Sequence, residues 1–217
     1  MANGTHSRFV VNQQPKRMMQ AIMGWWEHVP FEPNHVEMIF EKMVAPCYGW
    51  LFPESDTRVN IGICYEDATH RKNARLLFDQ FLQKHYRTRL TGAAQVGDWK
   101  GHPISYSYNV GRLQSPGRLV IGEAGRMTHP ATAEGIYQGM HSGMIAAEAV
   151  RDTISEKRAE REALAMYEMR CRRAFLASFL SAKLWRCAVT SPLLDWLVAF
   201  GQRPTAKTAL AKIIAQM

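Results

Sequence analysis

The sequence of 217 residues contains only four cysteines, and they are far apart. None belongs to a CxxC pair, and four are too few for a disulfide-stabilised scaffold; they are Cys47, Cys64, Cys171 and Cys187. The first thirty residues also lack the basic start and apolar run of a secretory signal. We therefore expect reduced thiols and a cytoplasmic location.

Several catalytic signatures are missing. The eight histidines are scattered without HxxxH spacing, so no metal site is predicted. There is no GxSxG nucleophile turn and no GxxxxGK[ST] phosphate loop. The GxGxxG turn that holds the pyrophosphate of a dinucleotide is absent as well. Binding of a dinucleotide would therefore need that half from a second source.

Negative charge is scarce toward the C-terminus. The net charge is +8, and from Arg151 onward twelve Lys and Arg residues stand against six Asp and Glu residues. A solvated helical face is the simplest interpretation, and contact with an anionic membrane surface is the alternative. No RNA- or DNA-binding motif accompanies the charge, so no nucleic-acid partner is predicted.

Long uninterrupted apolar runs are also missing. The segment 174–200 is rich in Phe, Leu and Trp, but Lys183, Arg186, Pro192 and Asp195 interrupt it. About twenty continuous apolar residues are needed to span a bilayer. We predict that the segment packs on the protein's own core. An interfacial helix, lying peripherally on the inner membrane, is the alternative.

Apolar residues make up 47% of the sequence, which is enough for a core, and their pattern changes along the chain. Val36, Met38 and Phe40 recur at every second position, and two short strands are predicted at 49–53 and 58–64. An amphipathic helix at 67–86 and an extended segment at 98–110 follow. This order predicts a sheet of strands joined by short connections, with one helix.

The second half of the chain is mainly helical. A turn at 116–117 precedes a short apolar strand, 118–122, and a long helix is predicted at 134–154. Residues 155–217 are predicted to be helical, with breaks at Pro192 and Pro204.

The strand 118–122 and the helix after it form a candidate ligand site. Gly122 ends the strand, and the carboxylate of Glu123 stands at its carboxyl end, where it can accept hydrogen bonds from sugar hydroxyls. The following loop contains Pro130 and small residues that let backbone approach a ligand. The helix start near Glu134 offers free N–H groups and the positive end of the helix dipole, which stabilise negative charge.

This stretch resembles the second flavin-contacting motif of the FAD enzymes related to para-hydroxybenzoate hydroxylase and geranylgeranyl reductase. The resemblance implies contacts with the ribityl chain and the isoalloxazine ring, mostly through backbone, by Gly122, Glu123, Pro130, Ala133, Gly135 and Ile136. Glu123 replaces the usual Asp. Ala133 replaces a usual Gly, which weakens binding if the position needs positive φ. A strand-loop-helix unit without a ligand is the alternative interpretation.

A shorter match lies at residues 2–8. Their sequence, Ala-Asn-Gly-Thr-His-Ser-Arg, resembles the family motif Ala-Asp-Gly-x-x-Ser, with Asn3 in place of Asp. In the family this motif bridges the flavin and pyridine-nucleotide regions.

An aromatic motif selects among these flavoenzymes. Tyr48, Trp50 and Phe52 fall on one face of the predicted strand, where they line an elongated apolar pocket or form ordinary core. Spacing alone favours core. The segment is similar to the geranylgeranyl reductase signature Tyr-x-Trp-x-Phe-Pro followed by Gly-x-Gly, with Cys64 in place of the final Gly. This similarity implies that the three aromatic residues contact an isoprenoid substrate. Related flavin-dependent halogenases carry Trp-x-Trp-x-Ile-Pro at this position.

The resemblance implies an α+β fold with an antiparallel-sheet substrate domain, the C-terminal part of an FAD-binding α/β domain and a helical tail. The expected parts are a remnant of the FAD-binding domain, the substrate-binding sheet, the flavin-contacting strand-loop-helix and the helical C-terminal region. In that order they cover 1–13, 14–115, 116–154 and 155–217.

The leading hypothesis is an FAD-dependent reductase of C=C bonds in a prenyl or similarly apolar substrate, with NAD(P)H or a reduced carrier as electron donor. A partner chain would supply the GxGxxG half. No catalytic residue is assigned, and His129, beside the loop, is either a proton donor or a structural residue. One alternative is a monooxygenase or halogenase of the same superfamily. The other is a non-catalytic ligand-binding subunit or relic, which Asn3, Glu123 and Ala133 favour.

Overall fold

A computed structural model describes residues 17–67 and 72–191. These residues fall into two compact units, one formed by 18–104 and the other by Arg17 with 105–191. We call them the sheet unit and the helical unit. The N-terminal motif at residues 2–8 lies outside the described residues.

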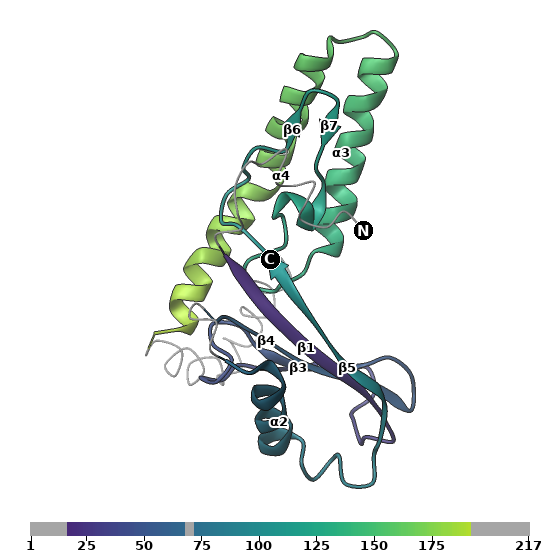
Figure 1. The fold of residues 1–217 in the computed structure, drawn as a ribbon, viewed down its shortest axis with the longest axis vertical. Helices are drawn as coiled ribbons and strands as arrows, with labels where there is room; N and C mark the ends of the chain where they lie inside the picture. The colour runs from purple at the N-terminus through teal and green to yellow at the C-terminus, as the bar shows by residue number, and fades with distance from the viewer. Residues whose placement is uncertain (1–16, 68–71, 192–217) are drawn as a thin grey trace, which may run out of the picture. The chain divides into compact units, whose positions relative to one another are not determined.

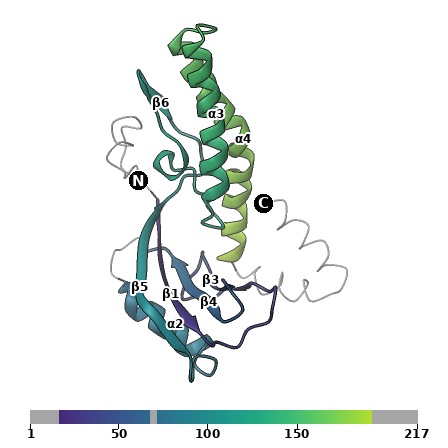
Figure 2. The same ribbon diagram turned by 90° about the vertical axis from the view of Figure 1, so that its right-hand side faces the viewer.

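The sheet unit is a five-stranded sheet with one helix on it (Figures 1 and 2). The strands lie in the order β2-β3-β4-β1-β5, and the pairs β1–β4, β2–β3 and β3–β4 are antiparallel. The strands are β1 (Met18–Glu27), β2 (Glu37–Ile39), β3 (Gly49–Pro53), β4 (Arg58–Tyr65) and β5 (Ala94–Ser105), and the helix is α2 (Ala74–His85). The predicted strands at 49–53 and 58–64 are therefore confirmed.

The two faces of this sheet differ because side chains alternate along each strand. The face toward α2 carries the aliphatic core residues of β3 and β4, including Leu51, Ile61 and Ile63, each fully buried. Phe78 and Phe81 of α2 complete that core. The opposite face, which we call the aromatic face, carries Tyr48, Trp50 and Phe52.

Helix α2 begins later than the sequence pattern predicts. The side chain of Asn73 accepts hydrogen bonds from the amides of Arg75 (3.1 Å) and Leu76 (3.2 Å), which fixes the helix start at Ala74. This cap explains the difference from the predicted start at Asp67.

An ion-pair cluster ties the last turn of α2 to the loop between β2 and β3. The carboxylate of Glu41 accepts a hydrogen bond from Lys84 and contacts the ring of His85. Burial raises the pKa of Glu41, but the bonds to Lys84 and His85 outweigh it and hold the pKa below its ordinary value of 4.5.

We expect Glu41→Gln to lower the free energy of unfolding by up to about 1 kcal/mol at neutral pH. A carboxylate whose pKa is lower in the folded state stabilises the fold above its unfolded-state pKa and loses that effect as pH falls through the folded-state pKa. The gap in thermal midpoint between wild type and variant, measured from pH 7 to pH 3, should therefore close at the acid end. A gap that stays constant would contradict the assignment.

The helical unit consists of two long helices and a small hairpin (Figure 1). Helices α3 (Ile136–Ile154) and α4 (Glu160–Val189) lie side by side, beside the hairpin of β6 (Gln114–Ser115) and β7 (Arg118–Leu119). Their core is formed by Ile145, Ala146 and Ala149 of α3 and by Tyr167, Cys171, Phe175 and Phe179 of α4. Burial raises the pKa of Cys171 to about 11, which keeps its thiol protonated and unreactive.

The predicted strand at 118–122 is wrong beyond Leu119. Within the part of the chain that the structure describes, Arg118–Leu119 pairs with Gln114–Ser115, the amide of Val120 adds one bond to the carbonyl of Leu113, and Ile121 is 46% exposed. A longer strand would need a further partner for its backbone groups. The chain instead enters a 3₁₀ turn, η1 (Gly122–Gly125). The observed architecture is α+β, as predicted.

The structure describes part of the segment 174–200, which was expected to pack on the protein's own core or to lie on a membrane surface. Phe175 and Phe179 are buried in the core, as packing on the protein itself predicts, whereas Leu180 and Leu184 of the same stretch are exposed. Within 17–67 and 72–191, none of the helices combines the length and apolarity required to cross a bilayer. Residues beyond 191 lie outside the description.

Candidate functional site

The aromatic face of the sheet unit brings together the three residues predicted to contact substrate. The ring of Trp50 lies 6.1 Å from that of Tyr48 and 5.9 Å from that of Phe52, centroid to centroid. Phe40 extends the row, with its ring 5.8 Å from Tyr48. Because aromatic side chains have few torsions, a continuous row of this kind is rigid. Tyr48 and Trp50 are buried, at 8% and 9% exposed, whereas Phe40 is 40% exposed.

Trp50 is held in one orientation by two neighbours on β4. Its indole N–H donates to the side-chain oxygen of Asn60 at 2.7 Å, and Asn60 donates to the carbonyl of Gly24 at 3.2 Å. The ring lies directly over Gly62, where an added Cβ would stand 2.2 Å from Cζ2 of Trp50. The spacing from Trp50 to this Gly therefore has a physical cause, because the two positions are cross-strand neighbours.

Sequence reasoning missed Asn60, although the sequence contains a signal for it. Asn60 is the one uncharged polar residue inside the apolar strand 58–65, and it is 7% exposed. A buried amide needs hydrogen-bond partners, so its position predicted a polar contact on the sheet.

Gly122, predicted to contact flavin, stands at the start of η1 against α3. Its φ is +54°, and an added Cβ would lie 3.1 Å from Cα of Gly139. Its amide donates to the hydroxyl of Ser142 in α3 at 3.0 Å. Gly122 is thus needed for close backbone approach between η1 and the helix.

Glu123 lies next to this contact with an exposed side chain. Its carboxylate accepts a hydrogen bond from the amide of Ser105 at 3.3 Å. This position leaves a carboxylate of η1 at the surface, where ribityl hydroxyls are expected by resemblance.

The loop 130–135 connects η1 to α3 and contains a strained residue. Ala133 has φ of +56°, in the left-handed region that glycine tolerates and alanine does not favour. Its amide donates to the carbonyl of His129 at 3.0 Å, which closes the turn. The position therefore has a positive φ, which is the case in which Ala in place of Gly was expected to weaken flavin binding.

We expect Ala133→Gly to stabilise the helical unit by about 1 kcal/mol, because it removes the cost of a left-handed alanine. The same change should strengthen flavin binding if the loop contacts the ring. Urea unfolding measures the first effect and FAD titration the second. Ala131→Gly, at a buried position of the same loop, is the control and should destabilise.

The start of α3 differs in one respect from the free helix end that was predicted. Gly135 is the N-cap, and Ile136, the first helical residue, is 77% exposed. The carboxylate of Glu134 accepts a hydrogen bond from the amide of Tyr137 at 2.8 Å. One of the donors expected to face a ligand therefore has an internal partner.

His129 is built into the loop. Its side chain is 1% exposed, its Nδ1 lies 3.0 Å from the hydroxyl of Thr132, and its ring packs on Phe179. Burial lowers its pKa, with Glu134 opposing the shift. Of the two roles considered, this geometry favours the structural one.

Arg186, an interruption of the apolar segment in the sequence, also reaches this loop. It is 4% exposed and donates from Nη1 to the carbonyl of Pro130 at 2.7 Å. Its guanidinium carbon lies 5.1 Å from the ring centroid of Tyr106. The sequence reasoning missed it, although Phe175, Phe179, Ala182, Arg186 and Val189 recur every three or four residues and so place it on the buried side of α4.

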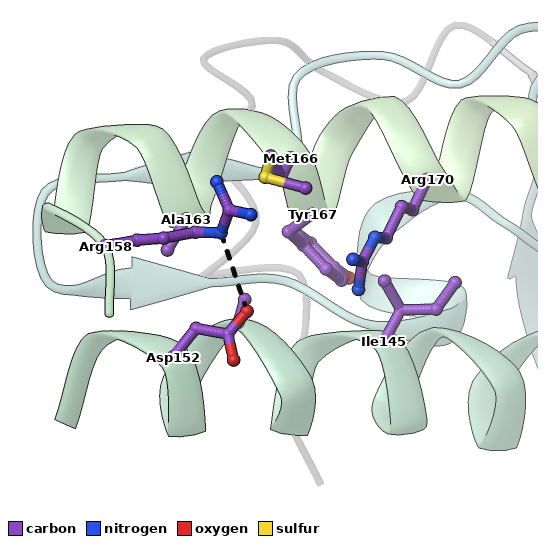
Figure 3. Close-up of a pocket in the computed structure, with 8 residues that line it drawn as sticks. Ile145, Asp152, Arg158, Ala163, Met166, Tyr167 and Arg170 are labelled. Carbon is purple, nitrogen blue, oxygen red and sulfur yellow. Dashed lines mark ion pairs between the residues drawn. The ribbon is translucent and has the colours of Figure 1, made fainter. Parts of the chain in front are cut away.

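Two cavities in the helical unit lie away from the loop. Figure 3 shows one of about 10 Å³ between α3 and α4, which has room for about one water. Asp152 and Arg158 form an ion pair beside it at 3.8 Å. The second, of about 280 Å³, is lined by Leu119, Val150 and Ile154 among others, at the far end of α3. Neither contains a residue predicted to bind flavin or substrate. Residues 17–67 and 72–191 show no group of three or more metal ligands.

The loop and the start of α3 fit a flavin ring. Ile136 at the first turn of α3 is exposed, as contact with a planar ring requires. The amides of Thr132, Ala133 and Glu134 already donate hydrogen bonds within the loop. The carboxylate of Glu134 opposes negative charge there.

Comparison with known proteins shows what the chain is similar to. Residues 16–96 match the model of the geranylgeranyl reductase catalytic domain. The chain is 34% identical over 143 residues to a digeranylgeranylglycerophospholipid reductase of Methanococcus vannielii, covering 63% of this chain and 34% of that protein. A reductase of the same name from Methanosphaerula palustris is 28% identical, covering 58% of this chain and 31% of that protein. The chain thus spans about a third of the length of these curated relatives.

Solved structures show the same fold. A geranylgeranyl bacteriochlorophyll reductase-like protein of Thermoplasma acidophilum superposes with a TM-score of 0.77 at 21% identity, covering 86% of this chain and 48% of that one. A flavin-dependent brominase has a TM-score of 0.62 at 15% identity, covering 100% of this chain and 62% of that one. The match includes the whole aromatic motif, 48–64. The chain therefore resembles the geranylgeranyl reductases over residues 16–96, and it shares the fold of the geranylgeranyl bacteriochlorophyll reductase-like protein.

Proposed function

We propose that this chain is the substrate-binding and flavin-contacting part of an FAD-dependent reductase that acts on C=C bonds of a prenyl or similarly apolar substrate. The observation that carries the proposal is the fixed orientation of Trp50, held by Asn60 and seated on Gly62. A rigid row of aromatic rings can bind an apolar chain with little loss of side-chain entropy.

The chain's own residues bind and orient. Tyr48, Trp50 and Phe52 hold the apolar substrate, and the loop 130–135 with the start of α3 holds the ring of FAD. When bound, FAD supplies the two electrons of the reduction. The exposed carboxylate of Glu123 accepts hydrogen bonds from ribityl hydroxyls.

The experiment combines flavin uptake with reduction of a prenyl substrate. The purified chain is mixed with FAD, its absorbance spectrum is recorded, and dithionite or NAD(P)H is added with geranylgeraniol. Mass spectrometry then detects the gain of two hydrogens. We expect Trp50→Leu to abolish most of that gain, whereas Trp99→Leu, on the α2 side of the sheet beside Phe78, should alter stability more than substrate use.

A second candidate is oxygen-dependent flavin chemistry, such as halogenation or hydroxylation. The likeness to the brominase fold over the full chain favours it. A halogenated or hydroxylated product in the same assay, with halide and oxygen present, would replace the first proposal. A chain that binds an apolar ligand but takes up no FAD under any condition would support a non-catalytic subunit.

The proposal includes a partner polypeptide that carries the GxGxxG half. Exposed apolar residues of α3, among them Met140 (68%) and Met144 (67%), support it, since a surface of this kind is usually covered. If so, FAD uptake by this chain should rise on co-expression with a neighbouring GxGxxG-containing chain. Equal uptake with and without it would contradict this part.

A cytoplasmic location with peripheral membrane contact completes the proposal. Exposed Leu180 and Leu184 on α4, together with an apolar substrate, support the contact. Flotation with anionic liposomes tests it, and failure to float would remove it.

A further inference from the structure

Arg186 carries a positive charge into the interior of the helical unit. Burial of an ionised side chain is costly unless hydrogen bonds or other polar contacts offset it. The contacts of its guanidinium are specific: one donor goes to the carbonyl of Pro130, and its plane lies by the ring of Tyr106.

The contact with Pro130 is the point at which α4 holds the loop 130–135. Pro130 and Ala131 are buried, and the chain then turns through Thr132 and Ala133 to the exposed start of α3. A charge-assisted hydrogen bond to the carbonyl of Pro130 holds the turn that the amide of Ala133 closes on His129. The position of the later backbone groups follows from it.

We propose that Arg186 is a positioning residue for the cofactor, which anchors the loop 130–135 through Pro130 and places a permanent positive charge beside it. This inference rests on the proposed binding of flavin at that loop. Its charge adds to the positive end of the α3 dipole and opposes the carboxylate of Glu134. Reduced flavin, which carries negative charge, should therefore gain more from Arg186 than oxidised flavin does.

Three variants of the full chain separate the two effects. Arg186→Met removes donor and charge, Arg186→Gln keeps a donor without charge, and Arg186→Lys keeps both. The matched control is Arg172→Met, because Arg172 also lies on α4 and donates to a backbone carbonyl, that of Val110 at 3.3 Å, outside the loop.

The first measurement is hydrogen exchange of the amides at 132–135 without cofactor. We expect exchange about tenfold faster in Arg186→Met, from loss of one charge-assisted bond, and no change in Arg172→Met. Arg186→Lys should restore slow exchange. This arm is independent of FAD, so it decides the anchoring role even if the chain takes up no flavin and the proposed function fails.

The second measurement is the midpoint potential of bound FAD and its dissociation constant. Arg186→Met should bind FAD about tenfold more weakly. Both Arg186→Met and Arg186→Gln should move the potential to more negative values, while Arg186→Lys keeps it. A merely structural arginine would lower the thermal midpoint without moving the potential. Should Arg186→Met fail to fold, Arg186→Gln decides the charge effect. Unchanged exchange in Arg186→Met, or an unchanged potential in Arg186→Gln, would overturn the proposal.

Discussion

Gly122→Ala should destabilise the helical unit by about 2–4 kcal/mol and abolish flavin uptake. Two costs add. A left-handed φ of +54° is unfavourable for any residue with a Cβ, and that Cβ would stand 3.1 Å from the backbone of Gly139. Because the obstacle is main chain, it cannot be relieved by a side-chain rotation. Separation of η1 from α3 would also break the bond from the amide of Gly122 to Ser142.

Gly143→Ala is the matched control for this substitution. Gly143 lies one turn further along α3, and its added Cβ would reach only ordinary contact, 4.0 Å from Ile121. Alanine is the better helix former, so this variant should gain about 0.5–1 kcal/mol. Urea unfolding of the two variants measures both. Equal stability of Gly122→Ala and wild type would show that η1 does not press on α3.

The parts of the fold that the sequence predicts well are those with local causes. Alternation predicts β3 and β4, and the aromatic motif places Tyr48, Trp50 and Phe52 on one face, because side chains alternate in any strand. The helix ends are less predictable: α2 starts where the side chain of Asn73 happens to cap it. The strand ending at Gly122 was wrong because a strand depends on partners elsewhere in the chain.

The candidate site shows the same division. The resemblance identified Ala133 as a residue that replaces Gly. The structure shows why this replacement matters, because φ at Ala133 is +56°. The roles of Asn60 and Arg186 were not predicted, because each depends on a partner distant in the sequence. Asn60 contacts a residue that lies 36 positions away, and Arg186 contacts one that lies 56 positions away. In the sequence, each is recognisable only as a polar residue among apolar residues of a buried face. That pattern indicates burial, but it does not identify the hydrogen-bond partner.

Gly62→Ala should cost about 1–3 kcal/mol in the sheet unit and most of the proposed reductase activity. The added methyl would stand 2.2 Å from the indole of Trp50, so the ring must move away from its position over Gly62. Its bond to Asn60 would then be lost, and Asn60 would keep only its bond to Gly24. A displaced Trp50 would break the aromatic row on which the substrate proposal depends.

A double-mutant cycle isolates the contact between Gly62 and Trp50. In the background of Trp50→Leu, a smaller side chain leaves room for the methyl of Gly62→Ala, so the second substitution should cost much less than in wild type. Chemical denaturation of the four proteins gives the coupling energy. Equal costs in both backgrounds would mean that the ring does not rest on Gly62. The fixed orientation of Trp50, which carries the substrate proposal, would then lose its support.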